Sequence, residues 1–553
     1  MVPKASFGAL SLLLLQFASG NENENAERTQ PDLKYAEDRA HMVFNEIHSA
    51  GRLWGSSLYH NGFGFFPATV PAGTMLYHGS QYNVTPSGLE WLAFDIEHSE
   101  NFARSFRLKP GEGPPPSVPL PDEDKSEQDD GLLSEGSLSE ELRRRSERST
   151  RENLPIRYNN KDEDLNIRGY LHLYQTTRDL NLLLIDGMSA GKTHMGTLDS
   201  QDLVLRANKD ASEKMGERSR ARELCELAAK WGLDGFVRME IGVEVIKCDF
   251  SKDLDLVNIM RTEVRDDIME DKGMDAFQWI RAVAERYDGI GADRLRIDFS
   301  SMISGLFFPI NISNTNPKRP DLKRLGAATP KELNDIKVYL KGVLSQPRRY
   351  TVNWQGVVDL IVSRYSRRIA LMAYKRLPSH HFINEVEGAT MTWYDAPTSP
   401  DDATLTEEGS INRTADAIEE CRVHYLRPAL LVKEKWSMED RLIYASLETV
   451  LGTICNTLYS VRRYILQASE RDGDHDAELE KAVQHGRVAM QELMGELGWT
   501  TWRKPQACAP DELSVIAMWP FGTKEDHWDP GCRSIDTVQH PNGTYWDVLG
   551  LFN

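Results

Sequence analysis

Three short segments in the first half of the sequence carry residue types that could act together on a sugar carbon. They are Leu76-Tyr-His-Gly-Ser80, the aromatic run Trp91-Leu-Ala-Phe94, and an acidic strand that contains Glu244. A carboxylate near a ribose hydroxyl stabilises the positive charge that develops in an oxocarbenium-like transition state, as in glycoside hydrolysis. Glu240, Gly242 and Glu244 share one strand face because side chains alternate with period two. This strand therefore presents two carboxylates, Glu240 and Glu244, on one face.

Strands and helices must bring these residues together, and the local patterns predict such elements. Short apolar or alternating runs predict strands, whereas apolar residues at helical spacing predict helices. The expected strands are 73–79, 89–94, 170–174 and 180–185, the expected helices are 96–106 and 219–231, and 235–249 is extended chain. Strands clustered in this way are typical of an α+β unit.

Residues 109–153 differ sharply in composition from the elements around them. They contain a proline run, an acidic stretch over 122–130 and three consecutive arginines at 143–145. Such a segment buries too little apolar surface to offset the cost of ordering. We expect a disordered acidic and proline-rich insertion, and we interpret the arginines as part of a solvated linker rather than a processing site.

In their order along the chain, the three segments resemble the ADP-ribosyltransferase fold. Members often begin with a strand ending in His-Gly or Arg-Gly and continue with an aromatic strand leading into a helix of the form Asp-x-Glu-x-Ala/Ser-x-x-Phe-Ala. In this sequence Asp95-Ile-Glu-His-Ser-Glu-Asn-Phe-Ala103 follows the aromatic run. They often end with a late strand that carries a glutamate. The resemblance covers about residues 70–250 without the insertion. It implies NAD as the substrate and Glu244 as the candidate catalytic carboxylate. It also implies that His78 bonds the adenosine-side ribose and that Gly79 is open to the nicotinamide amide. Tyr77 or Phe94 would stack near the nicotinamide ring.

One position departs from the pattern of members that modify arginine. Those members carry Gln or Glu two residues before the catalytic glutamate, and this sequence has Gly242 there. The departure favours NAD hydrolysis, or ADP-ribose transfer to another protein or small-molecule acceptor.

Two other functions remain open. Tyr77-His78-Gly79 could be an ordinary strand end and the aromatic run an ordinary core strand, which would leave a non-catalytic binding protein with a degenerate fold. An unrelated hydrolase is the other alternative, although no His-Glu-x-x-His helix occurs. The run Gly187-Met-Ser-Ala-Gly-Lys-Thr193 has three residues instead of four before Gly-Lys-Thr, so it does not predict a nucleotide-binding loop.

The second half of the chain has a helical character. Residues 275–287, 330–344, 354–374, 438–469 and 477–497 carry apolar residues at helical spacing. We therefore divide the chain into a signal peptide at 1–20, an α+β unit at 21–250 with its insertion, and a helical domain at 251–553 of unassigned role. The adjacent histidines at 380 and 381 are expected in a loop and not as metal ligands.

The N-terminus predicts secretion. A lysine at position 4 precedes an apolar run over 7–17 and the small residues 18–20, which together form a signal peptide pattern. That run is too short for a membrane anchor, and no later stretch reaches about 18 apolar residues. Sequons that could carry glycans in the secretory pathway begin at Asn83, Asn311, Asn412 and Asn542.

The cysteines agree with an oxidising compartment. There are six, and they fall into three sequence-local pairs. Short loop closure favours the pairing Cys225–Cys248, Cys421–Cys455 and Cys508–Cys532 among the 15 connectivities that six cysteines allow. None of them has zinc-ligand spacing, so we expect no metal.

Charge limits the partners. The formal net charge of -19 disfavours nucleic acid, because affinity for phosphates depends on Lys and Arg. We therefore expect an extracellular protein without nucleic-acid binding or a membrane anchor, and the sequence carries no signal for its oligomeric state.

Overall fold

The computed structural model describes most of the chain between residues 28 and 534. The described residues are 28–108, 165–191, 195–207, 216–240, 242–263, 289–291, 293–314, 316–397, 412–470, 475–504, 508–514, 526 and 530–534. The expected signal peptide, the insertion at 109–153 and the expected helix at 275–287 lie outside them.

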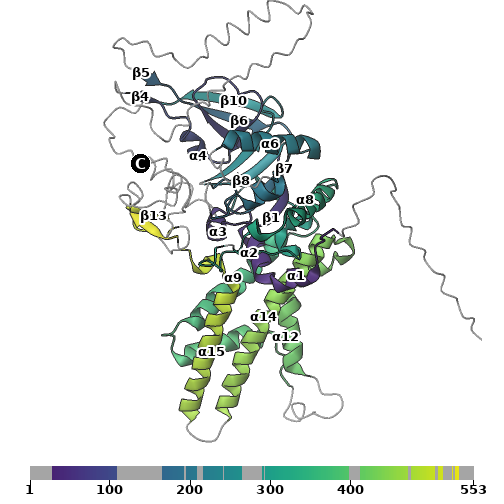
Figure 1. The fold of residues 1–553 in the computed structure, drawn as a ribbon. Coiled ribbons are helices and arrows are strands. Elements are labelled where there is room, and N and C mark those ends of the chain that lie inside the picture. The colour runs from purple at the N-terminus through teal and green to yellow at the C-terminus, as the bar shows by residue number, and fades with distance from the viewer. Residues whose placement is uncertain are drawn as a thin grey trace, which may run out of the picture.

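A mixed β-sheet forms the centre of the first half of the chain. Its strands run in the order β10-β6-β2-β3-β9-β8-β7-β1-β11, and β12 also pairs with β1. They are β1 (Gly64–Val70), β2 (Met75–Ser80), β3 (Glu90–Ala93), β6 (Tyr170–Thr176), β7 (Leu180–Ile185), β8 (Gly235–Met239), β9 (Val243–Lys247), β10 (Leu254–Arg261), β11 (Arg296–Ile297) and β12 (Ile303–Ser304). Two small sheets pair β4 (Phe106–Leu108) with β5 (Leu165–Ile167) and β13 (Glu512–Ser514) with β14 (Cys532–Ser534). Figure 1 shows β10 at the end of the main sheet remote from the long helices.

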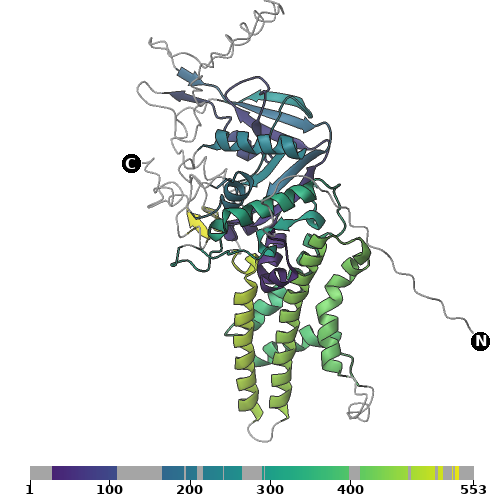
Figure 2. The same ribbon diagram turned by 45° about the vertical axis from the view of Figure 1, so that its right-hand side comes forward.

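The helices lie on the sheet or extend away from it as a bundle. They are α1 (Leu33–Asp38), α2 (Ala40–Ser49), α3 (Leu53–Leu58), α4 (Ile96–Glu100), α6 (Glu217–Trp231), α8 (Pro330–Leu344), α9 (Trp354–Ala373), α10 (Ser379–Thr390), α12 (Arg413–Val423), α13 (Arg427–Leu430), α14 (Met438–Ser469) and α15 (His475–Leu497), with a π-helix η1 (Ser200–Leu205). Short 3₁₀ turns are η4 (Phe299–Ser301), η5 (Gly305–Phe307), η6 (Leu325–Ala327), η7 (Met391–Trp393), η8 (His424–Leu426), η9 (Lys433–Lys435) and η10 (Thr500–Trp502). Figure 2 shows α14 and α15 extending side by side away from the sheet. The expected α+β unit followed by a mostly helical region is confirmed.

Local sequence signals explain where several of these elements begin. Helix α8 starts with a capping box in which Thr329 and Glu332 bond each other's backbone, and Pro330 occupies its first turn. The histidine pair expected in a loop lies instead in the first turn of α10, because Pro378 precedes that helix. Helix α4 is shorter than the expected 96–106, since the chain turns after Asn101 toward β4.

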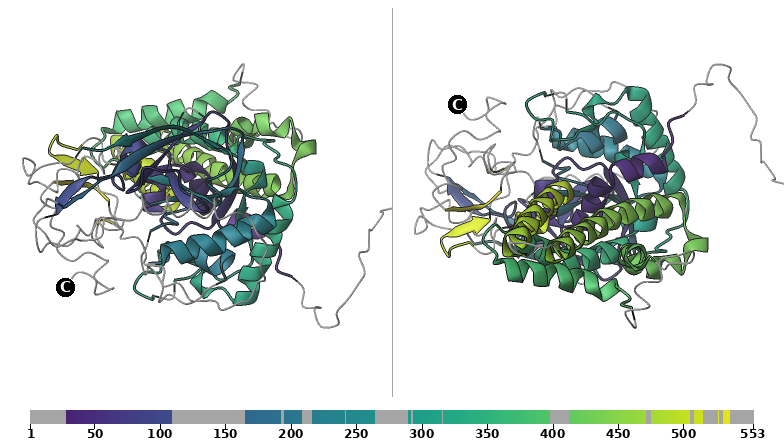
Figure 3. Two further views of the ribbon diagram at one scale, coloured as in Figure 1. Left: turned by 90° about the horizontal axis from the view of Figure 1, so that it is seen from above. Right: turned by 90° about the horizontal axis from the view of Figure 1, so that it is seen from below.

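The N-terminal helices pack with the C-terminal ones, although the sequence division assigns them to different units. Phe44 of α2 stacks on Trp499 with 5.4 Å between ring centroids, and the Asn45 side chain donates to the Leu497 carbonyl at 2.8 Å. In α14, Ser446 donates to the Ala36 carbonyl at 2.9 Å. Figure 3 shows the purple N-terminal helices beside the green C-terminal ones. In addition, β10, β11 and β12 belong to the main sheet although they lie beyond residue 250. Segments from each side of that boundary therefore contribute to the other unit.

Two carboxyl groups meet in the core between α2 and the end of β7. Glu46 is 4% exposed and Asp186 is 6% exposed. Burial first, and then the charge of Asp186, raise the pKa of Glu46 well above its ordinary value, and burial raises the pKa of Asp186 to about 7. The pair therefore retains a proton under conditions in which exposed carboxyl groups have lost theirs.

Candidate functional site

The three motif-bearing strands lie next to one another in the sheet. β2 pairs with β3, and β3 pairs with β9. The register aligns Tyr77 with Ala93, Ala93 with Glu244, and Glu244 with Arg238 of β8. Directly opposed residues of antiparallel strands point to the same face. Tyr77, Glu244 and Arg238 therefore lie in one row on one face of the sheet.

Helix α4 and the turn that follows it cover part of this face. A Cβ atom on Gly79 would lie 2.0 Å from the Ser99 carbonyl oxygen and 2.8 Å from the Phe102 Cβ. A Cβ atom on Gly242 would lie 2.3 Å from the ring of His98. These two glycines thus let the helix approach the sheet closely. The space above Gly79, expected to admit an amide, is filled by the protein's own backbone.

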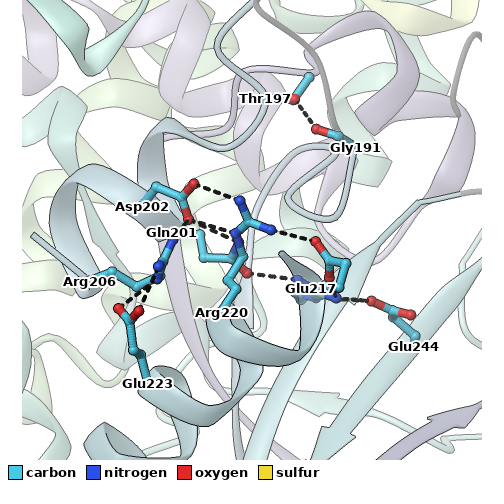
Figure 4. Close-up of polar contacts among 10 residues, drawn as sticks. Gly191, Thr197, Gln201, Asp202, Arg206, Glu217, Arg220, Glu223 and Glu244 are labelled. Carbon is cyan, nitrogen blue, oxygen red and sulfur yellow. Dashed lines mark hydrogen bonds and ion pairs between the residues drawn. The ribbon is translucent and has the colours of Figure 1, made fainter. Parts of the chain in front are cut away.

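The Glu244 carboxylate lies against the guanidinium of Arg238. Nε and Nη2 of Arg238 donate to the Oε1 atom of Glu244 at 2.9 and 2.5 Å, and the Glu244 side chain is 8% exposed. Nη2 also donates to Glu217 of α6 at 2.7 Å, while Nη1 donates to Gln201 of η1 at 3.1 Å. Figure 4 labels Gln201, Glu217 and Glu244, the three residues that accept these hydrogen bonds. Burial alone lowers the pKa of Arg238, but the charges of Glu217 and Glu244 outweigh it and raise that pKa.

Further ion pairs join α6 to the π-helix. Arg220 donates to Glu217 at 2.7 Å and to Asp202 at 3.0 Å. Arg206 bonds Asp202 at 3.1 Å and Glu223 at 2.8 Å (Figure 4). The acidic and basic groups alternate along this network, so the partners of each charge hold it in place.

His78 lies on the opposite face of the sheet from Glu244. Its neighbour Tyr77 shares the Glu244 face, and side chains alternate along a strand. His78 instead lies opposite His172 of the neighbouring strand β6, and its ring centroid is 5.4 Å from that of Phe250. Its Nδ1 atom donates to the Trp91 carbonyl at 2.8 Å. Burial lowers its pKa, against the effect of that hydrogen bond. Here His78 binds the backbone of β3, and its ring does not meet Glu244.

The two aromatic residues expected near nicotinamide, Tyr77 and Phe94, differ in exposure. Phe94 is fully buried in the core and therefore offers no open ring face, unlike the role expected from the resemblance. Tyr77 is partly exposed on the Glu244 face. Phe102, which we did not select from the sequence, is 37% exposed and stacks on His98 with 6.0 Å between ring centroids. The signal for it was present, because Phe102 is the phenylalanine of the Phe-Ala pair that ends the helix motif.

All three expected disulfides are confirmed. Cys225–Cys248 joins α6 to the residue after β9, Cys421–Cys455 joins α12 to α14, and Cys508–Cys532 links the segments that carry β13 and β14. Of the sequons, Asn83, Asn311 and Asn412 are exposed, whereas Asn542 lies outside the described residues. Asn412 also caps α12 by accepting from the Ala415 backbone.

The described residues contain neither a helix that could span a membrane nor a cluster that could hold a metal ion. No helix there is long and apolar enough to span a bilayer. No group of three or more His, Cys, Asp or Glu side chains there is arranged to hold a metal ion.

The similar proteins have names that assign no activity. A family described as the YPL277C N-terminal domain matches residues 33–271, a range that contains the three motif strands. The uncharacterized protein YOR389W of Saccharomyces cerevisiae is 25% identical over 558 aligned positions, which cover 88% of this chain and 83% of that protein. The uncharacterized protein YPL277C of the same yeast is 30% identical over 233 positions, which cover 40% of this chain and 43% of that protein. No solved structure matches.

Proposed function

We propose that the sheet unit is an ADP-ribosyltransferase-like domain that cleaves the bond between nicotinamide and ribose in NAD. The observation that carries this proposal is the adjacency of β2, β3 and β9, whose register aligns Tyr77, Ala93 and Glu244 on one face. Those three strands carry the segments on which the resemblance was based. Residues of one site must lie close together in the folded protein, and the order of their segments along the chain does not ensure this.

Glu244 is the catalytic residue in this proposal. Its carboxylate accepts a hydrogen bond from a ribose hydroxyl, and its negative charge stabilises the oxocarbenium-like transition state. The bond from the ribose carbon to the nicotinamide nitrogen breaks, and the electron pair leaves with nicotinamide. A water oxygen then bonds the ribose carbon and loses one proton to solvent, which yields ADP-ribose.

The surrounding side chains suggest how the substrate is held. Phe102, whose Cβ atom lies close to Gly79, has a partly exposed side chain that stacks against nicotinamide in this proposal. His78 supports the site indirectly through its bond to the backbone of Trp91. Because Gly242 stands where arginine-modifying members carry Gln or Glu, the acceptor is water or a protein or small molecule other than an arginine side chain.

The proposal extends to the compartment. The N-terminal signal pattern and the exposed sequons at Asn83, Asn311 and Asn412 support a secreted protein. Three disulfides that use every cysteine agree with an oxidising environment.

A second candidate is a non-catalytic binding protein with a degenerate form of the fold. Two observations favour it: the ion pair between Glu244 and Arg238, and the filling of the space above Gly79 by residues 99–103. A carboxylate that is already neutralised stabilises a second cation less strongly.

The two candidates separate in an assay of nicotinamide release. Purified secreted protein is incubated with NAD, and nicotinamide is quantified by chromatography; labelled NAD with candidate acceptors detects transfer. We expect release by the wild type and a loss of about 10²-fold in Glu244→Gln, the scale typical when one electrostatic stabiliser is removed. Glu223→Gln is the matched control, because Glu223 is 41% exposed and bonds only Arg206 among the described contacts.

Each outcome decides a different point. Binding of NAD with neither release nor transfer by the wild type would establish the non-catalytic candidate. Full release by Glu244→Gln would exclude Glu244 as the catalytic residue.

A further inference from the structure

Arg238 contacts Glu244 asymmetrically. Both of its hydrogen bonds to that side chain reach Oε1, from Nε and from Nη2. Within the part of the chain that the structure describes, no donor is bonded to Oε2. One carboxylate oxygen is thus anchored by the protein, and the other is the one a ligand hydroxyl would meet.

Arg238 itself is held on all sides. Its guanidinium nitrogens donate to Glu244, to Gln201 at 3.1 Å and to Glu217 at 2.7 Å, and the residue is 1% exposed. A planar guanidinium with its donors engaged in this way has one orientation available. Because its side chain is only 1% exposed, it acts through Glu244 and does not reach a ligand in solvent.

The two acceptors that fix Arg238 come from elements outside the motif strands. Gln201 lies in the π-helix η1, and Glu217 begins α6. The disulfide from Cys225 to Cys248 ties α6 to the end of β9, the strand that carries Glu244. The helix that orients the arginine and the strand that carries the carboxylate are therefore covalently linked.

We propose that Arg238 is a positioning residue for the reaction: it anchors Oε1 of Glu244 so that Oε2 accepts from the ribose hydroxyl of NAD. This inference rests on the proposed NAD cleavage. It assigns the ion pair a role in catalysis, whereas a degenerate site would use the same pair only to neutralise a buried charge. A misplacement of about 1 Å at a reacting group costs on the order of 10²-fold in rate.

The test measures kcat and KM for nicotinamide release separately. Arg238→Met removes every donor, so kcat should fall by about 10²-fold with KM little changed, because positioning acts on the transition state. Arg238→Lys keeps the charge and a single donor group, so it should recover part of the loss. Glu223→Gln, at the far end of the network, serves as the control with unchanged kcat.

A substitution at a more exposed residue, Glu217, provides a second test in case Arg238→Met does not fold. Glu217 is 21% exposed and binds both Arg220 and Arg238. In Glu217→Gln the amide offers one oxygen to two guanidinium groups, so Arg238 loses orientation and kcat should fall several-fold while the thermal midpoint stays near that of Glu223→Gln.

The results distinguish this inference from the proposed function. If the wild type releases no nicotinamide and transfers no ADP-ribose, the proposed function and this inference both fail. If the wild type is active and kcat is unchanged in both Arg238→Met and Glu217→Gln, only the positioning role fails. Equal losses in Arg238→Met and Arg238→Lys, in step with loss of folded protein, would also overturn it, because a purely structural role gives that result.

Discussion

The buried pair of Glu46 and Asp186 predicts that this protein loses stability as the pH rises. We consider Asp186→Asn, which replaces one carboxyl group by a neutral side chain of the same shape. Asp186 is 6% exposed, accepts from the Gly187 backbone and bonds Glu46. An amide reproduces the protonated form, since its oxygen accepts and its nitrogen donates. The substitution therefore removes a titration with little change in packing.

The sign follows from proton linkage. Burial raises the pKa of Asp186 in the folded state to about 7, whereas an aspartate in an unfolded chain has a pKa of about 3.9. Between those values the folded state binds more protons than the unfolded state, so the free energy of unfolding falls as pH rises. The stabilising contribution is complete below about pH 4 and is lost as pH rises through about 7. Three pKa units correspond to about 4 kcal/mol, a large part of the 5–15 kcal/mol typical of folded proteins.

Urea unfolding at pH 4, 5, 6, 7 and 8, with disulfides intact, measures this contribution. We expect the free energy of unfolding of Asp186→Asn, minus that of the wild type, to rise by about 4 kcal/mol from pH 4 to pH 8. Asp255→Asn, at an exposed position of β10, is the control and should give a flat difference. A difference for Asp186→Asn that is flat or falls with pH would refute the reasoning.

Three further predictions concern structure and compartment. Replacing Cys225 and Cys248 by serine should lower the free energy of unfolding by about 3 kcal/mol, because the disulfide closes a loop with a sequence separation of 23; chemical denaturation checks this, and no change would contradict it. Asp298→Ala should cost about 3 kcal/mol in the same measurement, since fully buried Asp298 accepts from Ser301 and from the backbone of Arg349 and Tyr350; Asp298→Asn, which keeps an acceptor, should cost less. Enzymatic removal of N-glycans should increase the gel mobility of secreted protein, and Asn83→Gln should reproduce part of that shift; unchanged mobility would argue against glycosylation.

Elements with strong local signals were predictable from the sequence. The expected helices at 330–344 and 438–469 coincide with α8 and α14, and the expected strand at 180–185 coincides with β7. Capping residues and long apolar periodicity specify such segments without help from distant contacts. The disulfide pairing followed from short loop closure for the same reason.

The site was only partly predictable. The sequence identified the strands that carry Tyr77 and Glu244, and pairing between strands far apart in the chain made them neighbours. It did not indicate that the His78 side chain would lie on the sheet face opposite Glu244. Alternation shows which residues of one strand share a face, but it does not show how that face aligns with the faces of other strands. It also did not indicate Arg238, whose partners Gln201 and Glu217 become close only after η1 and α6 fold onto the sheet.

By itself, the sequence determined the signal peptide pattern, the sequons, the cysteine pairing and the succession of an α+β unit and a helical region. Each of these depends on composition or on residues that are close along the chain. The tertiary structure alone decided that α2 packs against the C-terminal helices, that Glu46 and Asp186 share a buried site, and that Arg238 anchors one oxygen of Glu244. These features depend on long-range packing, because only the folded chain excludes water and brings distant charges within hydrogen-bonding distance.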